Sequence, residues 1–420
     1  MIAQRMRGCV KYLRSQRQRG LRVGAAMRQK PGSLRVTVNQ LSHPPEVLKR
    51  TPFYDMHVAH GARMVPFAGY EMPVSYPLGV LKEHLHTRAA SGLFDISHMG
   101  QIALWPKSGV LADAAQALER LAPIDVVSLA AGRQRYGYFT NDSGGVLDDF
   151  MVANMADHLL LVVNASRKDA DEHHLAAHVS DQCRVERLDR ALLALQGPKS
   201  EEVLASFAPA CAGMRFMDVA TLNIRGAECI VARSGYTGED GFEISVAIDA
   251  ARAVADALLT NPHVALIGLG ARDSLRLEAG LCLYGSDIDE QTSPIEAGLT
   301  WAIQKSRRAN GERAGGFPGV AKLLRQIAES PSRRRVGLRP EGRAPIRNAT
   351  LLFADLAAPD AIGCVTSGGY GPSVDGPIAM GYLPASLAQR GRTVFAEVRG
   401  KRHAVSVVEL PFIASNYKRS

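Results

Sequence analysis

The feature that most constrains the fold is that short apolar segments occur in adjacent pairs joined by turn residues. Segments 136–140 and 146–153 flank Asn141-Asp142-Ser143-Gly144-Gly145, which is typical of a β-hairpin. Because strand and helix candidates do not alternate strictly, we expect an α+β fold rather than a doubly wound α/β sheet. Further strand candidates are 101–105, 158–164, 190–196, 218–223, 227–233 and 242–247, and helix candidates are 108–121, 166–179, 199–207, 249–259 and 269–280.

The 420 residues are enough for two or three domains of about 150 residues each. Residues 305–319 are polar, basic and glycine-rich, and a short helix is predicted at 320–329, before Pro331. From residue 335 onward short β-type runs are separated by Gly and Pro, which indicates a small all-β barrel or sandwich. We therefore predict a leader at 1–46, a core of two α+β subdomains at 47–304, a linker with a short helix at 305–334 and a β-domain at 335–417.

The net charge of +9 is concentrated in the leader, because residues 1–45 hold ten Lys and Arg and no Asp or Glu. Removing those ten charges leaves −1 for residues 46–420, so the folded part lacks the basic surface of a nucleic-acid-binding domain. The leader is either an amphipathic mitochondrial presequence or a basic extension, and Met27 is an alternative start. We expect a mitochondrial matrix location in the first case and a cytoplasmic one if the protein is bacterial.

The composition also excludes several classes of protein. Hydrophobic residues make up 46% and charged residues 22%, as in soluble globular chains. The longest apolar runs, such as 159–163, are far shorter than the ~20 residues that span a membrane. The six cysteines lie far apart without a Cys-x-x-Cys pair, so we expect neither a disulfide framework nor a zinc site, and we expect buried thiols at Cys229 and Cys282.

Two adjacent carboxylates interrupt the apolar strand at 146–153. Strand alternation places Asp148 on the face of Val146 and Phe150, and Asp149 on the opposite face. Buried carboxylates are rare unless they are paired or functional. The alternatives are a turn cap or an arginine partner, and a calcium loop would require a glutamate at its twelfth position, which is absent.

Other polar motifs have both structural and functional interpretations. Three glycines in 235–241 permit a tight loop before a strand in which Glu243 points away from the core face, toward solvent or a ligand. Residues 271–280 predict a salt-bridged surface helix in which Asp273 and Arg276 pair. The His84-Leu85-His86 motif is more typical of structural histidines than of a metal site.

Together these segments resemble the aminomethyltransferase of the glycine cleavage system, the T-protein. The resemblance covers roughly residues 48–417. The matching motifs, in chain order, are Arg50-Thr51-Pro52-Phe53-Tyr54, Phe67-Ala68-Gly69-Tyr70, Leu93-Phe94-Asp95-Ile96-Ser97-His98-Met99, Gly144-Gly145-Val146-Leu147-Asp148-Asp149, Leu195-Gln196-Gly197-Pro198, Tyr236-Thr237-Gly238-Glu239-Asp240-Gly241, residues 271–280 and Val365-Thr366-Ser367-Gly368-Gly369.

The resemblance implies three domains in a cloverleaf around a folate-binding channel, the last a small β-barrel. It implies transfer of a one-carbon unit from an aminomethyl group on the lipoyl arm of the H-protein to tetrahydrofolate, which acts as co-substrate. The products are methylenetetrahydrofolate, ammonia and the reduced lipoyl arm. No metal, nucleic acid or membrane partner is expected.

The resemblance also assigns roles to individual residues. Asp149, the second carboxylate of its motif, matches the catalytic aspartate. The residues that match folate- or substrate-binding positions are Met99, Asn164, Tyr236, Glu243, Arg272 and Tyr417. Whether Arg272 contacts folate or the lipoyl-bearing partner is not decided by the sequence.

The alternative function within the same superfamily is a folate-binding protein of iron–sulfur assembly. That group carries a Lys-Gly-Cys-Tyr-x-Gly-Gln-Glu signature, whereas this chain has Ala279-Gly280-Leu281-Cys282-Leu283-Tyr284-Gly285-Ser286-Asp287. A sarcosine or dimethylglycine dehydrogenase would need a flavin domain upstream, with a Gly-x-Gly-x-x-Gly motif that is absent here.

Overall fold

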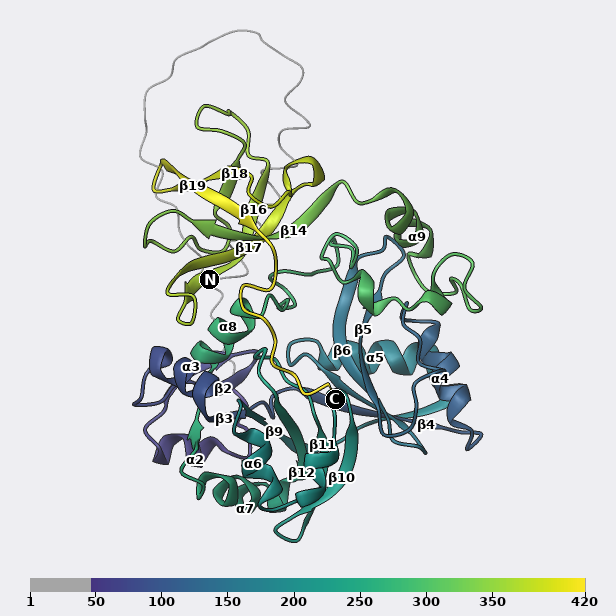
Figure 1. Ribbon diagram of the computed structural model, residues 1–420. Coiled ribbons are helices and arrows are strands. Elements are labelled where there is room, and N and C mark those ends of the chain that lie inside the picture. Colours follow the sequence, from purple (N-terminus) through teal and green to yellow (C-terminus); the bar gives the residue numbers. More distant parts are fainter. Residues whose placement is uncertain (1–46, 420) are drawn as a thin grey trace, which may run out of the picture. The chain divides into compact units, whose positions relative to one another are not determined.

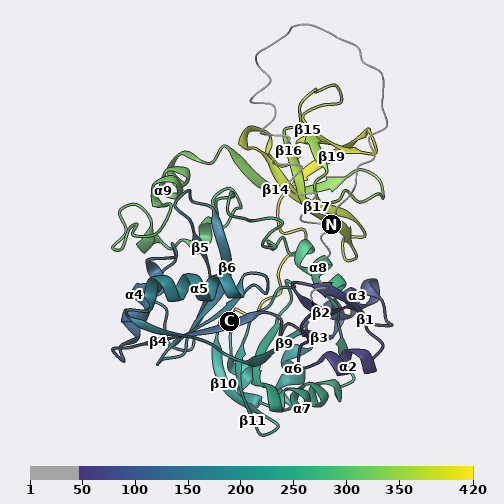
Figure 2. The same cartoon turned by 180° about the vertical axis from the view of Figure 1, so that it is seen from behind.

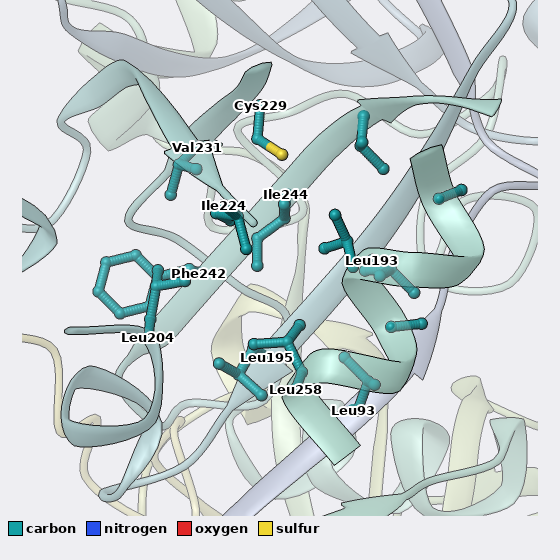
Figure 3. Close-up of a cluster of buried hydrophobic side chains, with 14 of the residues drawn as sticks. Leu93, Leu193, Leu195, Leu204, Ile224, Cys229, Val231, Phe242, Ile244 and Leu258 are labelled. Carbon is teal, nitrogen blue, oxygen red and sulfur yellow. The ribbon is translucent and has the colours of Figure 1, made fainter. Parts of the chain in front are cut away.

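The computed structural model describes residues 47–419, so the predicted leader at 1–46 lies outside the described residues. One part of the fold is a six-stranded sheet in the order β10-β11-β12-β9-β3-β13 (Figure 1). Its apolar face packs against helices through a core that includes Leu193, Phe242 and Leu258 (Figure 3). The elements are α2 (Tyr54–Ala59), β3 (Ser91–Asp95), β9 (Arg190–Gln196), α6 (Ser200–Ala205), β10 (Val219–Ile224), β11 (Ala227–Ala232), β12 (Gly241–Ala247), α7 (Ile248–Leu259) and β13 (Val264–Leu266).

A second sheet has five antiparallel strands in the order β5-β6-β7-β4-β8. Alternate residues of these strands, among them Phe139, Phe150 and Leu161, form a buried core with the helices α4 and α5. Burying each such side chain contributes about 1.5–3 kcal/mol. The elements are β4 (Gly100–Pro106), α4 (Leu111–Glu119), β5 (Gln134–Thr140), β6 (Val146–Asn154), β7 (Leu159–Val163), α5 (Lys168–Val179) and β8 (Cys183–Arg187).

The C-terminal strands form a closed barrel in the order β14-β17-β16-β15-β18-β19. Its interior is filled by aliphatic side chains such as Leu338, Val365 and Val405. Because the barrel is closed, each of its strands pairs with a neighbour on both sides. The expected α+β class and the small C-terminal barrel are thereby confirmed. The strands are β14 (Arg333–Pro340), β15 (Leu351–Phe353), β16 (Gly363–Gly371), β17 (Gly376–Pro384), β18 (Thr393–Val398) and β19 (Lys401–Val408).

The helix predicted as a salt-bridged surface helix is instead largely buried. α8 (Leu269–Glu278) contacts α3 (Val80–Ala89), β2 (Tyr70–Ser75) and β16, and Arg276 is only 3% exposed. The predicted pair with Asp273 does form, at 2.8 Å, but Arg276 also bonds Asp287 at 2.8 Å. A guanidinium group is tolerated inside the protein when such carboxylates satisfy its N–H groups, which the sequence spacing alone does not reveal.

The linker and the C-terminal tail are both packed segments. In the linker, Arg307 is buried against Glu119, with an N–O distance of 3.2 Å. After β19 the tail runs back from the barrel to the six-stranded sheet, where the Asn416 amide donates to the Gly238 carbonyl at 2.8 Å (Figures 1 and 2). The remaining elements are β1 (Arg63–Phe67), β2 (Tyr70–Ser75), η2 (Pro209–Gly213), η3 (Thr300–Ala302), η4 (Lys305–Arg307), α9 (Val320–Glu329) and η5 (Ala385–Leu387).

The predicted strands and helices all appear, with ends displaced by a few residues. Among the strands that were not predicted, β2 and β17 contain Gly or Pro, and β3 is short and buried throughout. Neither kind shows the alternation of apolar and polar residues that marks a half-buried strand. In residues 47–419 no helix is both long and apolar enough to cross a membrane.

Candidate functional site

Three neighbouring strands bring a carboxylate, a phenol and an amide together. Asp149 lies on β6, Tyr136 on the adjacent β5, and Asn164 directly follows β7 on the other side. The Tyr136 hydroxyl donates to Asp149 Oδ2 at 2.9 Å, and Asn164 Nδ2 donates to Asp149 Oδ1 at 2.8 Å. Both carboxylate oxygens of Asp149 are therefore held in a fixed orientation.

Burial raises the pKa of Asp149 to about 7, and the negative charge of neighbouring Asp148 raises it further in the same direction. The hydrogen bonds from Tyr136 and Asn164 favour the ionised form and partly offset this rise. A carboxyl group with a pKa near neutrality exchanges protons readily at physiological pH. This is the property that general acid–base catalysis requires.

Asp148 is fully buried on the opposite face of β6, as strand alternation predicted. Its oxygens accept hydrogen bonds from the Asn164 backbone amide at 3.1 Å and from Asn164 Nδ2 at 2.9 Å, so neither a turn cap nor an arginine is its partner. Burial and the charge of Asp171 on α5 raise the pKa of Asp148 to about 8, and burial raises that of Asp171 to about 6. Asn164 thus connects the two neighbouring carboxyl groups.

A cavity lies between the five-stranded and the six-stranded sheets, and we call it the inter-sheet cavity. Met151 forms part of its wall, and Asp149 lies two residues before Met151 on the same face of β6 without itself lining the cavity. Most of the wall is apolar, with a few polar groups. The lining residues are Gln101, Gln134, Met151, Ala153, Leu160, Val162, Leu192, Val219, Ile230, Ala232, Glu243 and Ser245.

Glu243 enters the inter-sheet cavity from β12, opposite the core face formed by Phe242 and Ile244. Its Oε2 accepts a hydrogen bond from the Ser234 hydroxyl at 2.7 Å. The expectation that Glu243 points away from the core face is confirmed, and its side chain faces the cavity. A carboxylate in this position can accept hydrogen bonds from paired N–H donors of a flat heterocycle.

Arg272 and Tyr236 form a stacked pair close to Glu243. The guanidinium carbon of Arg272 lies 4.8 Å from the centre of the Tyr236 ring, and the Tyr236 hydroxyl donates to the Cys282 carbonyl. Burial lowers the pKa of Arg272, while the charge of Glu243 opposes that shift. Arg272 Nη1 is buried without a hydrogen-bond partner, so it can donate to an acceptor group on a bound ligand.

The other two predicted site residues differ in their surroundings. Met99 is half-buried just before β4 and packs against the cluster of Phe94 and Ile96. The ring of Tyr417 stacks on Phe216, with centroids 4.1 Å apart, rather than on the residues around Asp149. Met99 is thus placed at the start of a strand that lines the inter-sheet cavity, whereas Tyr417 is held by the docked tail.

Several residues of this site were not identified from the sequence. Tyr136, Asp171 and Gln101 belong to segments that were predicted correctly as strands or helices, whereas Gln134 lies just before the predicted strand 136–140. The hairpin register could have identified Tyr136, because β5 pairs with β6 and places the side chain diagonally across from Asp149. The approach of Asp171 depends on how α5 packs on the sheet, which the sequence pattern does not specify.

The cysteines and histidines of the described part have structural surroundings. Cys229 and Cys282 are buried free thiols, as expected. His84 is buried and contacts Glu278 Oε2 at 3.0 Å, which agrees with the structural interpretation of its motif. Among residues 47–419 no group of three or more His, Cys, Asp or Glu side chains is arranged to hold a metal ion.

Comparison with known protein families gives two matches along the chain. Residues 53–307 match the family model described as the GCVT N-terminal domain. Residues 333–413 match the model described as the glycine cleavage T-protein C-terminal barrel domain. The second match coincides with the closed barrel.

Curated relatives and a solved structure agree with these matches. The chain is 43% identical to the human protein named aminomethyltransferase, mitochondrial, over 90% of this chain and 93% of the relative. It is 40% identical to the Dictyostelium discoideum protein of the same name, over 89% and 94%. The crystal structure of the glycine cleavage system aminomethyltransferase T from Bartonella henselae is similar with a TM-score of 0.81 and 46% identity, covering 89% of this chain and 100% of that one.

Proposed function

Since this chain belongs to the aminomethyltransferase family, the T-protein of the glycine cleavage system, we propose that Asp149 and the inter-sheet cavity form its active site. The chain is a transferase of glycine catabolism that passes a one-carbon unit to tetrahydrofolate. The iron–sulfur assembly alternative is not favoured, because the matching relatives are named aminomethyltransferases.

The observation that carries this proposal is a half-buried carboxyl group with a pKa of about 7, fixed by two hydrogen bonds on the strand face that also lines a largely apolar cavity. Tetrahydrofolate supplies the nitrogens that take up the one-carbon unit. Asp149 holds or removes a proton at the reacting nitrogen, and Tyr136 and Asn164 keep its carboxyl group oriented. The apolar cavity wall excludes water from the transfer.

The remaining polar groups fit a reduced folate. Glu243 presents a carboxylate to the cavity, which suits the amino and ring N–H groups of a pterin. Arg272 has a buried N–H without a partner, which suits a carbonyl or carboxylate acceptor. We assign folate or substrate binding to Met99, Asn164, Tyr236, Glu243, Arg272 and Tyr417, and the contacts of Tyr417 with Phe216 give it the least direct support.

The proposed partner is the lipoylated H-protein, which carries the aminomethyl group. An exposed ring provides a route toward the buried carboxyl group. Trp301 is 60% exposed and stacks on Tyr136 with ring centroids 5.4 Å apart, and Tyr136 in turn bonds Asp149. A lipoyl arm that contacts Trp301 would therefore be separated from Asp149 by a single side chain.

Glycine cleavage reconstituted from purified partner proteins tests the function. We expect one-carbon transfer and ammonia release that depend on both tetrahydrofolate and this chain. In thermal melts, tetrahydrofolate at ~100 times its Kd should add about 2.7 kcal/mol to the free energy of unfolding. An unchanged melting temperature at saturating tetrahydrofolate would count against the folate site.

The location is proposed from the leader and the relatives together. Human and Dictyostelium relatives are named mitochondrial, which supports a matrix location if residues 1–45 act as a presequence. The similar structure from Bartonella henselae leaves the cytoplasmic alternative in place. Fusing residues 1–46 to a fluorescent protein and testing import into isolated mitochondria distinguishes the two locations.

A further inference from the structure

Two glutamine side chains at the inter-sheet cavity have hydrogen-bonding atoms without partners. Gln134 lies on β5, two residues before Tyr136, and its side chain is 6% exposed with Nε2 unpaired. Gln101 lies on β4, two residues after Met99, and is 2% exposed with Oε1 unpaired. Gln134 therefore shares a strand face with Tyr136, and Gln101 lies close along the chain to Met99.

The remaining contacts of Gln101 identify which of its amide atoms is free. Its Nε2 donates to the Arg190 backbone carbonyl at 2.9 Å, so the unpaired atom is an acceptor. For Gln134 the unpaired buried atom is the donor nitrogen, and its backbone is already anchored by pairing with Ala153 on β6. The cavity wall thus offers one free acceptor and one free donor.

Unsatisfied buried amides are costly for a folded protein, so native structures contain few of them. Apolar side chains of similar size at these positions would pack against the same wall without that cost. Both unpaired glutamines face one cavity, together with Glu243 and beside Asp149. Several unsatisfied buried polar groups at one place are typical of a site that binds a polar ligand, because such a site lowers the stability of the ligand-free protein.

We propose that Gln101 and Gln134 are ligand-binding residues that hydrogen-bond the pyrimidinone ring of the pterin. The inference rests on the proposed function, since it takes a reduced folate as the ligand. A pterin ring carries an amino group, ring N–H groups and a carbonyl oxygen. Glu243 can accept two of the N–H bonds, Gln101 Oε1 a further one, and Gln134 Nε2 can donate to the carbonyl oxygen.

The test uses replacement of Gln134 by Met, which keeps the length of the side chain and removes its polar atoms. We expect the Kd for tetrahydrofolate, measured by calorimetry on the full chain, to rise about 10-fold, which is 1.4 kcal/mol. The melting temperature of the ligand-free variant should stay the same or rise, because an unsatisfied amide has been removed. Gln134→Leu should behave in the same way.

Gln196 provides the matched control for a glutamine with a structural role. It is fully buried, its Nε2 donates to the Ser234 carbonyl at 2.8 Å, and its Oε1 accepts from the Thr237 hydroxyl at 2.9 Å. Gln196→Met should lower the melting temperature of the ligand-free protein. Gln101→Met should weaken tetrahydrofolate binding and also lower the melting temperature slightly, because the bond to Arg190 is lost.

A fragment of the ligand distinguishes contact with the ring from contact with the tail. We expect 6-methyltetrahydropterin, which lacks the aminobenzoyl-glutamate tail, to lose affinity for Gln134→Met by the same factor as tetrahydrofolate. Loss with tetrahydrofolate alone would refute contact with the ring. Unchanged affinity for both compounds would show that bound water satisfies the amides and would overturn the inference while the proposed function stands. Failure of the unaltered protein to bind tetrahydrofolate would overturn both.

Discussion

Replacing Asp149 with Asn should lower turnover by about 10²–10⁴-fold, the range expected when a general acid–base group is lost. With a pKa of about 7, roughly half of the Asp149 carboxyl groups are ionised at pH 7. Below pH 7 the ionised fraction falls about tenfold for each pH unit, so turnover should show an inflection near pH 7. The amide of Asn cannot titrate, so the inflection should disappear together with most of the activity.

Folding and folate binding should change much less in Asp149→Asn. The new amide oxygen can accept the hydrogen bond from Asn164, and the Tyr136 hydroxyl can rotate to accept from the amide nitrogen. Glu243 and Tyr236 remain available for the pterin. Melting temperature and tetrahydrofolate affinity should therefore stay close to those of the unaltered protein, which separates a catalytic loss from a structural one.

The neighbouring Asp148 provides the matched control. With a pKa of about 8, Asp148 is mostly protonated at pH 7, so Asp148→Asn should retain turnover and leave the inflection in the pH profile near pH 7. The assay measures turnover from about pH 5 to pH 9 for both variants, together with melting temperature and folate affinity. If Asp148→Asn abolished turnover in a folded protein and Asp149→Asn did not, the assignment of the catalytic carboxylate would be reversed.

Three further predictions follow from the sequence and the structure. A chain beginning at Pro44 should fold and keep full turnover, since the matched motifs lie beyond the leader; loss of folding on truncation would contradict this. Burial raises the pKa of Asp148 to about 8 in the folded protein, compared with about 3.9 in the unfolded chain. The contribution of Asp148 to the free energy of unfolding therefore grows as pH falls from 8 to 4 and is lost as pH rises through 8. Melting temperatures should therefore show Asp148→Asn gaining stability over the unaltered protein as pH rises to about 9, with no such trend for exposed Asp142→Asn as control. Tyr136→Phe removes a bond to ionised Asp149, so the inflection in turnover should move above pH 7; an unchanged inflection would show that this bond does not tune the carboxyl group.

The sequence predicts most of the fold where hydrophobic periodicity is strong. The segment 320–329 was placed with the observed ends, because its apolar residues recur at helix spacing and Gly319 and Pro331 lie close to its ends. β3 escaped detection because all of its residues are buried and no alternation remains. The burial of α8 likewise depends on contacts with distant segments. Arg276 makes the helix look like a surface helix in the sequence, although it is buried and paired with Asp287.

The site was predictable to the extent that one strand determines it. Alternation along β6 separated Asp148 from Asp149 correctly, and alternation along β12 directed Glu243 away from the core. Alternation did not predict that Asn164, from the end of the next strand, would bond both carboxyl groups. That contact depends on the register between strands and on the end of β7, neither of which is encoded in the pattern of a single segment.

The docked C-terminal tail has a consequence for biosynthesis. Asn416 is synthesised long after Gly238, yet its backbone amide bonds the Gly238 carbonyl, in the loop that carries Tyr236. Domains generally fold as the chain emerges, with the N-terminal part first. Docking of the tail on this loop therefore has to wait until Asn416 has left the ribosome, and a chain that stops before residue 416 lacks this contact. An affinity tag placed after Ser420 would follow closely on the docked Lys418, whose Nζ contacts Glu201 at 2.8 Å.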